Sequence, residues 1–299
     1  MNVFLLIFSI IMSLLSCGIL RNEFCKKELA GNSDLYVFNT VNSVLSAITL
    51  LIVAAISGTL CVPSMYTLLM GVAFGFATAS CAVLSMIALE SGPLSYTNVI
   101  VSCAMVIPAL SGLVLYGEAV SAWQWAGIAL MIVSFVCAVD SNNEGSGASL
   151  KWLLLCLGAF LGSGSVGVMQ KLHQNSVYKD ELGVFLVVAF VASALFSLIL
   201  TIYYSRVRGE PITVVRAPKF KKFAIISFIS GVGFALVNQI NMYLAGVIDA
   251  IIFYPVVNGA SMILTTAAGI ILWKEKLSKR QWFGLAAGGV AIFLLCNVL

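Results

Sequence analysis

Apolar runs long enough to cross a lipid bilayer recur along the whole chain, and they restrict its fold more than any other feature. A membrane-spanning helix needs about 20 apolar residues, each adding about 1.5 Å, and the sequence offers ten such segments. We place them near residues 3–20, 35–58, 66–89, 94–115, 122–139, 150–172, 182–204, 222–245, 249–272 and 280–298. The expected fold is therefore an all-α integral membrane protein with ten transmembrane helices.

The composition agrees with a chain dissolved in lipid. Of its 299 residues, 61% are hydrophobic and 9% are charged, whereas about a quarter of the residues in a soluble domain are charged. No basic residue precedes residues 3–20, so we interpret them as the first membrane helix and not as a cleaved signal peptide. The eight cysteines are scattered without a Cys-x-x-Cys pair, and we expect no disulfide, no metal and no cofactor.

One fifteen-residue phrase occurs twice in the chain. Residues 115–129 (LYGEAVSAWQWAGIA) and residues 272–286 (LWKEKLSKRQWFGLA) share seven identities at an offset of 157. The alignment extends without a gap around this phrase, and further upstream an offset of about 145 sets Lys26 against Lys171. The chain therefore divides into two five-helix repeats, residues 1–145 and 146–299. Because five is odd, the second repeat enters the membrane in the opposite orientation, which makes an inverted repeat.

Equivalent loops of the two repeats differ in charge, as inversion requires. The loop near residue 118 contains no Lys or Arg, whereas its counterpart near residue 275 carries four. Cytoplasmic loops carry the excess of Lys and Arg, and placing both termini outside puts 14 basic residues inside and 2 outside. We therefore expect a multi-pass protein of the plasma membrane, the inner membrane in a prokaryote, with both termini on the outer face.

The repeated phrase also carries a helix-start signal. Each copy has a Ser-x-x-Gln capping box, in which the serine hydroxyl and the glutamine side chain satisfy exposed backbone amides. A tryptophan follows in the first turn, where aromatic residues mark the membrane interface, and a glutamate precedes the box. We interpret these residues as starting and anchoring the fifth and tenth helices, in preference to a catalytic or ion-coupling role. The six polar residues of the motif are Glu118, Ser121, Gln124, Glu275, Ser278 and Gln281.

Ten helices in two inverted halves, each ending in glutamate, a polar turn and Gln-x-x-Gly, resemble the drug/metabolite transporter superfamily, and its EamA-like branch in particular. The matching residues are Glu118, Gln124 and Gly127, and Glu275, Gln281 and Gly284. The resemblance covers nearly the whole chain. It implies alternating-access transport of a small-molecule substrate, with a central site between the halves near the membrane midplane. Members are often drawn with cytoplasmic termini, whereas the charges of this chain favour the reverse.

Polar side chains within the expected helices are candidates for that site, because such groups are costly in lipid and usually face a cavity or a partner. The candidate substrate-binding residues are Asn39, Asn42, Asn98, Ser102, Asn238, Asn241, Tyr254 and Asn258. Polar residues also form hydrogen bonds between membrane helices, so a packing role stays open for each. We interpret the helical glycines as close-packing residues; they are Gly75, Gly158, Gly162, Gly164, Gly167, Gly231 and Gly233.

Charged residues fall at the ends of the expected helices or in loops. His173, the only histidine, is expected at the membrane interface and not as a proton shuttle. Small multidrug exporters of the same superfamily use a carboxylate deep in the first helix, and residues 3–20 contain none. An uncharged polar or zwitterionic metabolite, such as an amino acid or a nucleoside-like compound, therefore fits better as the substrate than a lipophilic cation.

Two other functions stay open. A flippase for a lipid-linked metabolite is a variant of transport that would need a lateral opening between helices. An integral membrane enzyme is less favoured, because it needs a nucleophile with a base, paired carboxylates or a metal cluster. Membrane lipid is an expected partner, and nucleic acid is not, because the basic residues form short runs and no basic face.

Overall fold

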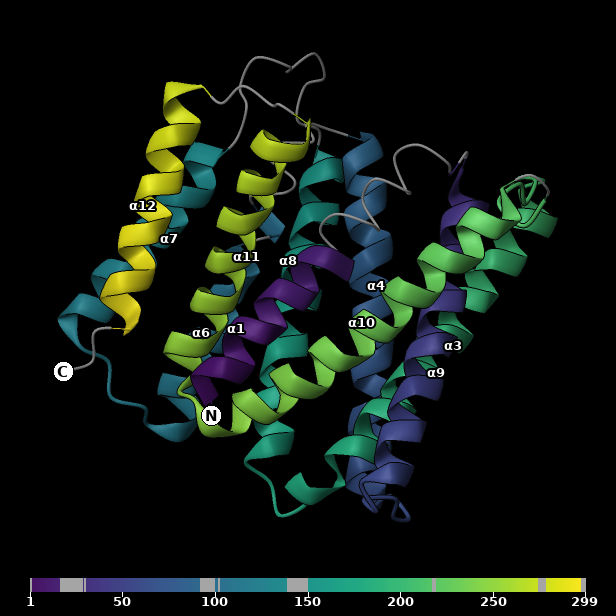
Figure 1. Cartoon of the computed structure of the whole chain (residues 1–299), viewed down its shortest axis with the longest axis horizontal. Coiled ribbons are helices and arrows are strands. Elements are labelled where there is room, and N and C mark those ends of the chain that lie inside the picture. Colours follow the sequence, from purple (N-terminus) through teal and green to yellow (C-terminus); the bar gives the residue numbers. More distant parts are fainter. Residues whose placement is uncertain are drawn as a thin grey trace. The chain divides into compact units, whose positions relative to one another are not determined.

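The computed structural model describes residues 2–16, 29, 31–91, 100–101, 103–138, 150–216, 219–273 and 278–296. Within these residues the chain forms ten α-helices (Figure 1). They are α1 (Asn2–Ser13), α3 (Asn32–Ile56), α4 (Met65–Ser91), α6 (Val106–Tyr116), α7 (Ala122–Ala138), α8 (Leu150–Gln174), α9 (Leu182–Ile202), α10 (Phe220–Val247), α11 (Ala250–Trp273) and α12 (Lys279–Cys296). Short helical turns are η2 (Cys103–Met105), η4 (Lys179–Glu181) and the π-helical η5 (Tyr203–Val207). The expected all-helical fold with ten helices is confirmed for this part of the chain.

Within the described residues, five helical segments are long and apolar enough to cross a membrane. They are Asn32–Ile56, Met65–Ser85, Leu150–Gln174, Lys179–Val207 and Phe220–Val247. Four further helices are apolar but shorter over their described lengths. Large apolar side chains such as Phe4, Leu154 and Phe293 are exposed on the helices, which suits contact with lipid and not with water. The chain is an all-helical membrane protein.

The helices group into two compact units, and each unit combines early and late parts of the chain. The first unit comprises Met1–Ala79 with His173–Tyr243, and the second comprises Ser80–Leu172 with Leu244–Leu299. The compact units therefore do not coincide with the predicted repeats, residues 1–145 and 146–299. Each unit contains helices from both repeats.

In the first unit, α3 packs along α9 (Figure 1), and α1 lies against α10. The α1 contact is held by Ser9, whose hydroxyl donates to Asn241 Oδ1 at 2.6 Å. Glycine allows α4 to approach α9 closely, because a Cβ added at Gly75 would collide with the Ala189 carbonyl oxygen. Burial of Phe74 and Phe185, whose rings meet edge to face at 5.4 Å, completes this contact.

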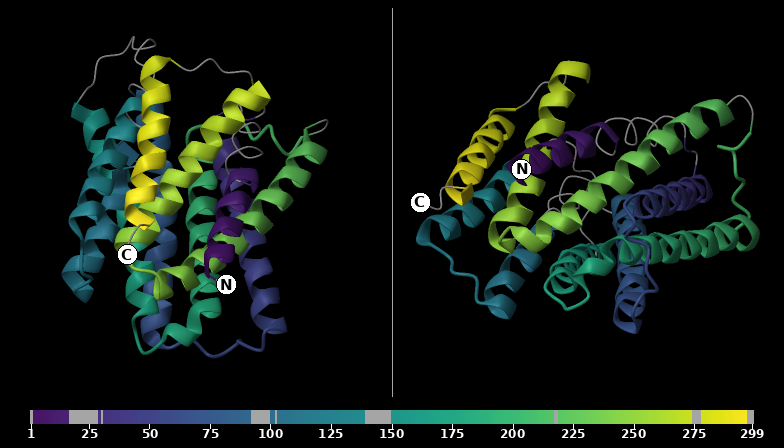
Figure 2. Two further views of the ribbon diagram at one scale, coloured as in Figure 1. Left: turned by 60° about the vertical axis from the view of Figure 1, so that its left-hand side comes forward. Right: turned by 60° about the horizontal axis from the view of Figure 1, so that its bottom comes forward.

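In the second unit, α7 packs along α12 (Figure 2) and α6 packs against α11. Two contacts hold the first of these pairs. A Cβ added at Gly127 would lie 3.2 Å from the Ala291 carbonyl oxygen, and the Ser134 hydroxyl donates to the Gly284 carbonyl at 2.6 Å. Gly284 is the repeat equivalent of Gly127, and Ala291 that of Ser134, at the offset of 157. The α7–α12 pair therefore contains two residue pairs, Gly127 with Ala291 and Ser134 with Gly284, whose members the sequence alignment exchanges.

The interpretation of the glycines as close-packing residues is confirmed at most positions. A Cβ added at these glycines would come within 3.1 Å of a side chain or backbone atom of another helix, which is closer than a normal van der Waals contact. The confirmed positions are Gly75, Gly158, Gly164, Gly167, Gly231 and Gly233.

Candidate functional site

A buried amide without a partner lies inside the first unit. Asn42 of α3 is only 7% exposed, and within the described residues neither its Oδ1 nor its Nδ2 has a hydrogen-bond partner. Leaving a buried polar group unsatisfied costs about 1–3 kcal/mol, and native proteins rarely do so without a functional reason. Asn42, one of the predicted binding residues, is therefore a candidate contact for a polar ligand.

The helix α10 presents a glycine and a serine to this part of α3. A Cβ added at Gly231 would lie 3.4 Å from Asn42 Oδ1, and the Ser46 hydroxyl donates to the Gly231 carbonyl at 2.8 Å. Ser227 lies one helical turn before Gly231, on the same face of α10. Its hydroxyl is fully buried and has no partner in the part of the chain that the structure describes. An unpartnered amide and an unpartnered hydroxyl therefore lie along the α3–α10 contact.

The other predicted residues of the first unit are engaged or only half-buried. Asn241 accepts the Ser9 hydroxyl and so ties α1 to α10. Asn238 donates its Nδ2 to the Phe234 carbonyl one turn earlier in α10, at 2.9 Å. Asn39 lies one turn before Asn42 in α3 and is half-buried. Gln239 was not among the predicted binding residues, yet its buried Oε1 has no partner among the described residues.

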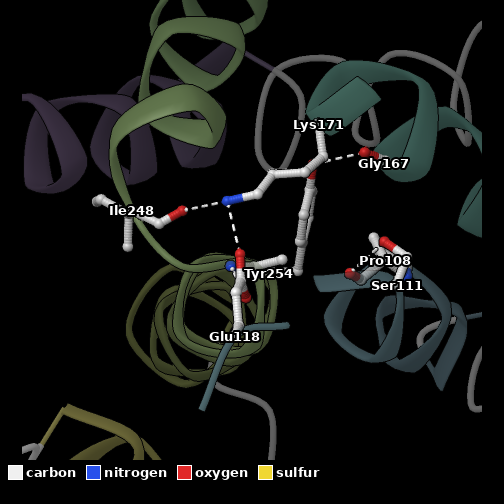
Figure 3. Close-up of polar contacts among 8 residues, drawn as sticks. Pro108, Ser111, Glu118, Gly167, Lys171, Ile248 and Tyr254 are labelled. Atoms are coloured by element: carbon white, nitrogen blue, oxygen red, sulfur yellow. Dashed lines mark hydrogen bonds and ion pairs between the residues drawn. The ribbon is translucent and has the colours of Figure 1, made fainter. Parts of the chain in front are cut away.

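In the second unit the two predicted residues of α11 bond to backbone carbonyls. The Tyr254 hydroxyl donates to the Gly167 carbonyl of α8 at 2.6 Å (Figure 3), and Asn258 donates its Nδ2 to the Tyr254 carbonyl at 2.8 Å. Tyr254 thus joins α11 to α8, which is the packing role that the sequence left open. A substrate contact by either residue stays a prediction.

A buried ion pair lies in the same unit, and the sequence did not predict it. Lys171 of α8 and Glu118, which follows α6, meet at 2.8 Å with side chains 6% and 8% exposed (Figure 3). Lys171 Nζ also donates to the Ile248 carbonyl at 3.0 Å, and the Glu118 carboxylate accepts the Ala250 amide at 2.9 Å. The pair therefore satisfies a carbonyl at the end of α10 and an amide at the start of α11, which are groups that a helix end leaves open.

The sequence did carry a signal for this pair. Glu118 and Lys171 both fall at repeated positions, since Glu118 aligns with Glu275 and Lys171 aligns with Lys26. The alignment singled out the two positions, but it did not indicate that their side chains meet. Four residues of the sequence-based argument lie outside the described residues; they are Lys26, Asn98, Ser102 and Glu275.

Both capping boxes form as the sequence indicates. The Ser121 amide donates to Gln124 Oε1 at 2.8 Å, and the Gln124 amide donates to Ser121 Oγ at 3.3 Å. Ser278 and Gln281 make the same two bonds, at 2.9 and 3.3 Å. These four residues start α7 and α12, which gives them a structural role.

A buried carboxylate near the start of α3 is also satisfied by the protein. Asp34 accepts the Thr213 amide at 2.6 Å, the Thr213 hydroxyl at 2.5 Å and the Val214 amide at 3.0 Å. Several hydrogen bonds to one carboxylate hold its side chain in place. Protein groups therefore meet the charge of Asp34 in the first unit, just as they meet the Glu118–Lys171 pair in the second.

Comparison with known proteins shows a similar fold and gives no activity for this chain. No protein-family model matches the chain, and no curated protein matches it. One solved structure, described only as a crystal structure of a protein, covers 99% of this chain and 96% of its own with a TM-score of 0.77. The two sequences are 14% identical, so the likeness shows the fold alone. Fold and composition together define the class as a multi-pass, all-helical membrane protein.

Proposed function

We propose that the protein is a secondary active transporter that moves a small polar or zwitterionic metabolite across the plasma membrane by alternating access. The observations that carry this proposal are the unpartnered amide of Asn42 on α3 and the unpartnered hydroxyl of Ser227 on α10, one helical turn before the glycine that approaches Asn42. The buried charges of Asp34, Glu118 and Lys171 already have protein partners. A ligand between α3 and α10 would therefore meet hydrogen-bonding groups and no net charge.

Membership of the EamA-like branch of the drug/metabolite transporters belongs to the same proposal. Reciprocal contacts between Gly127 and Ala291 and between Gly284 and Ser134 are what two inverted repeats related by an approximate two-fold axis produce. The pairs α3–α9, α6–α11 and α7–α12 also join helices that hold equivalent places in the two repeats. The proposed orientation, with both chain termini outside the cell, is supported by the distribution of Lys and Arg among the loops.

Ligand-induced stabilisation tests the proposal. A ligand that binds only the folded state raises the apparent unfolding temperature, so the purified protein is screened in detergent against amino acids and nucleosides. Once a ligand is found, Asn42→Ala should abolish its stabilising effect. The variant alone should unfold at the same temperature or a higher one, because it removes a buried group that has no partner.

Thr201→Ala is the matched control for this experiment. Thr201 is a buried polar residue of α9 in the same unit, and its hydroxyl donates to the Ser197 carbonyl of its own helix. We expect this variant to keep the full ligand response. An Asn42→Ala protein that still responds to the ligand, or a screen in which only net-charged metabolites bind, contradicts the proposed site.

A flippase for a lipid-linked metabolite is the second candidate, and a groove in the first unit favours it. The groove lies between α3 and α9, has a volume of about 320 Å³ and is lined by apolar side chains that include Val44, Ile48 and Leu195. An acyl chain would suit such a lining, because it is as apolar as the groove. Translocation of a fluorescent lipid-linked sugar in proteoliposomes, without uptake of soluble metabolites, would favour this function.

A further inference from the structure

The apolar groove between α3 and α9 is open to the surroundings of the first unit. The one polar side chain of its lining, Thr40, donates its hydroxyl to the Tyr36 carbonyl of its own helix at 2.8 Å. The groove therefore offers no side-chain hydrogen bond to an occupant, and an acyl chain of the surrounding lipid fits such a lining. Six large apolar residues of the lining are between 42% and 57% exposed; they are Val44, Ile48, Leu51, Val191, Leu195 and Leu198.

The helices α3 and α9 run in opposite directions along this groove (Figure 1). The ring of Tyr36, near the start of α3, lies 5.0 Å from that of Tyr204, just after α9, centroid to centroid. At the opposite end, a Cβ added at Gly183, near the start of α9, would lie 3.4 Å from the side chain of Ala54, near the end of α3. One end of the groove therefore leads to η5 and the segment after it, and the other end leads to η4.

The two ends differ in charge. Residues 206–222, which begin within η5, contain six Lys or Arg residues and one acid, whereas η4 contains one lysine and two acids. Clusters of four to eight basic residues beside a membrane helix are typical of binding sites for anionic lipid headgroups. The η5 end therefore suits an anionic headgroup, and the η4 end does not. Five of the six basic side chains are exposed; they are Arg206, Arg208, Arg216, Lys221 and Lys222.

The carboxylates near the η5 end face the protein. Glu210, the one acid of the basic segment, accepts the Ser33 amide at 3.1 Å and Asn32 Nδ2 at 3.3 Å. Asp34 accepts both the amide and the hydroxyl of Thr213. These bonds hold the segment against the start of α3 and turn its acid inward, so the exposed charge of the segment is basic.

One face of α9 joins the groove to the basic end. Leu195, Leu198, Ile202 and Arg206 follow each other at intervals of three and four residues, which places them on the same side of the helix, and all four are exposed. At about 1.5 Å per residue, Leu198 and Leu195 lie about 12 and 17 Å from Arg206 along the helix axis. One leaflet of the hydrocarbon core is about 15 Å thick. A lipid whose phosphate lies at Arg206 therefore reaches the groove with its acyl chain.

We propose that this surface binds an anionic phospholipid, with the phosphate at Arg206 and Arg208 and one acyl chain in the α3–α9 groove. Arginine suits this role because its planar guanidinium binds phosphate through two parallel hydrogen bonds. A free phosphate makes no use of the groove, and a zwitterionic lipid leaves the net positive charge of the segment unmatched. The site rests on neither of the proposed functions, because it requires no transported substrate.

Lipid retention by the purified full-length protein tests this site. The protein is delipidated in detergent and titrated with dioleoyl phosphatidylglycerol, and native mass spectrometry counts the lipids that stay bound. We expect one tightly retained phosphatidylglycerol and much weaker retention of dioleoyl phosphatidylcholine. Arg206→Ala combined with Arg208→Ala should weaken phosphatidylglycerol binding about 30-fold, because each basic side chain contributes about fivefold. The corresponding double lysine variant should keep most of the affinity.

Variants of the groove separate the acyl chain from the headgroup. Leu195→Trp fills the groove and keeps both arginines, so it should also weaken retention. Two controls should retain the lipid fully. Lys179→Ala removes an exposed basic residue at the η4 end of the groove, and Leu69→Trp enlarges an exposed apolar residue of α4 outside the groove. Glycerol phosphate, which is the soluble part of the headgroup, should not displace the lipid.

Several results would overturn the site. Equal retention of the two lipids, equal losses in Lys179→Ala and in the double alanine variant, or displacement by glycerol phosphate would each contradict it. A dimer that Leu195→Trp converts to a monomer would mean that a second copy of the chain occupies the groove. If Leu195→Trp fails to fold, the arginine variants and the lysine control still decide the question. Failure of metabolite binding at Asn42 would leave these measurements unaffected.

Discussion

The Glu118–Lys171 pair should behave as one energetic unit. Removing one partner of a buried ion pair costs about 3–5 kcal/mol, whereas replacing both by uncharged groups is often nearly neutral. Among the described residues, Lys171→Met leaves the Glu118 carboxylate buried with the Ala250 amide as its one hydrogen-bond donor. Adding Glu118→Gln removes that charge and keeps a side-chain oxygen for the same amide. We therefore expect the double variant to be more stable than Lys171→Met, although it carries one more substitution.

Equilibrium unfolding in mixed detergent and SDS micelles, followed by tryptophan fluorescence, gives the free energy of each variant. Lys171→Met should lose about 3–5 kcal/mol of unfolding free energy, and the double variant should recover most of that loss. The matched control is Lys151→Met, an exposed lysine at the start of the same helix, which should change stability by no more than about 0.5 kcal/mol. Additive losses in the double variant would refute the reasoning, because they would mean that the two charges do not depend on each other.

Three further predictions concern packing, caps and orientation. Gly75→Ala should lower stability by about 1–3 kcal/mol in the same unfolding assay because its Cβ meets a carbonyl of α9, whereas Gly289→Ala, with open space around it, should not. Ser121→Ala should cost about 0.5–2 kcal/mol as a lost cap and leave ligand-induced stabilisation unchanged; a changed ligand response would show a role beyond the cap. Cys61, exposed in the loop after α3, should react with a membrane-impermeant maleimide in intact cells, whereas Val207→Cys combined with Cys61→Ser should react only after permeabilisation; the reverse pattern contradicts the predicted orientation.

The helices and their caps could be predicted from the sequence because they depend on neighbouring residues. A run of apolar residues sets a membrane helix, and a Ser-x-x-Gln box joins residues three apart, so Ser121 and Gln124 needed no tertiary information. The same holds for the glycines of α8, since small residues in a membrane helix mark close packing wherever the partner lies.

The site could be predicted only in part, because its chemistry depends on residues far apart in the chain. Asn42 was a candidate from its polarity alone. That its buried amide faces Gly231 of α10, which has no side chain to bond to it, depends on tertiary structure. Glu118 meets Lys171 because the turn between α10 and α11 offers one carbonyl and one amide to the pair. His173 is fully buried because its ring packs against Phe185 of α9 and near Tyr66 of α4, and no local sequence pattern indicates those contacts.

The reciprocal contacts of α7 and α12 have a consequence for how the chain can diversify. In a symmetric dimer of identical subunits, one substitution alters both copies of an interface contact. Here both copies lie in one polypeptide, and they already differ: Gly127 meets an alanine backbone, whereas Gly284 accepts a hydrogen bond from Ser134. The two contacts use different residues of one polypeptide, so a substitution at one of them leaves the other in place, whereas a symmetric dimer would lose both.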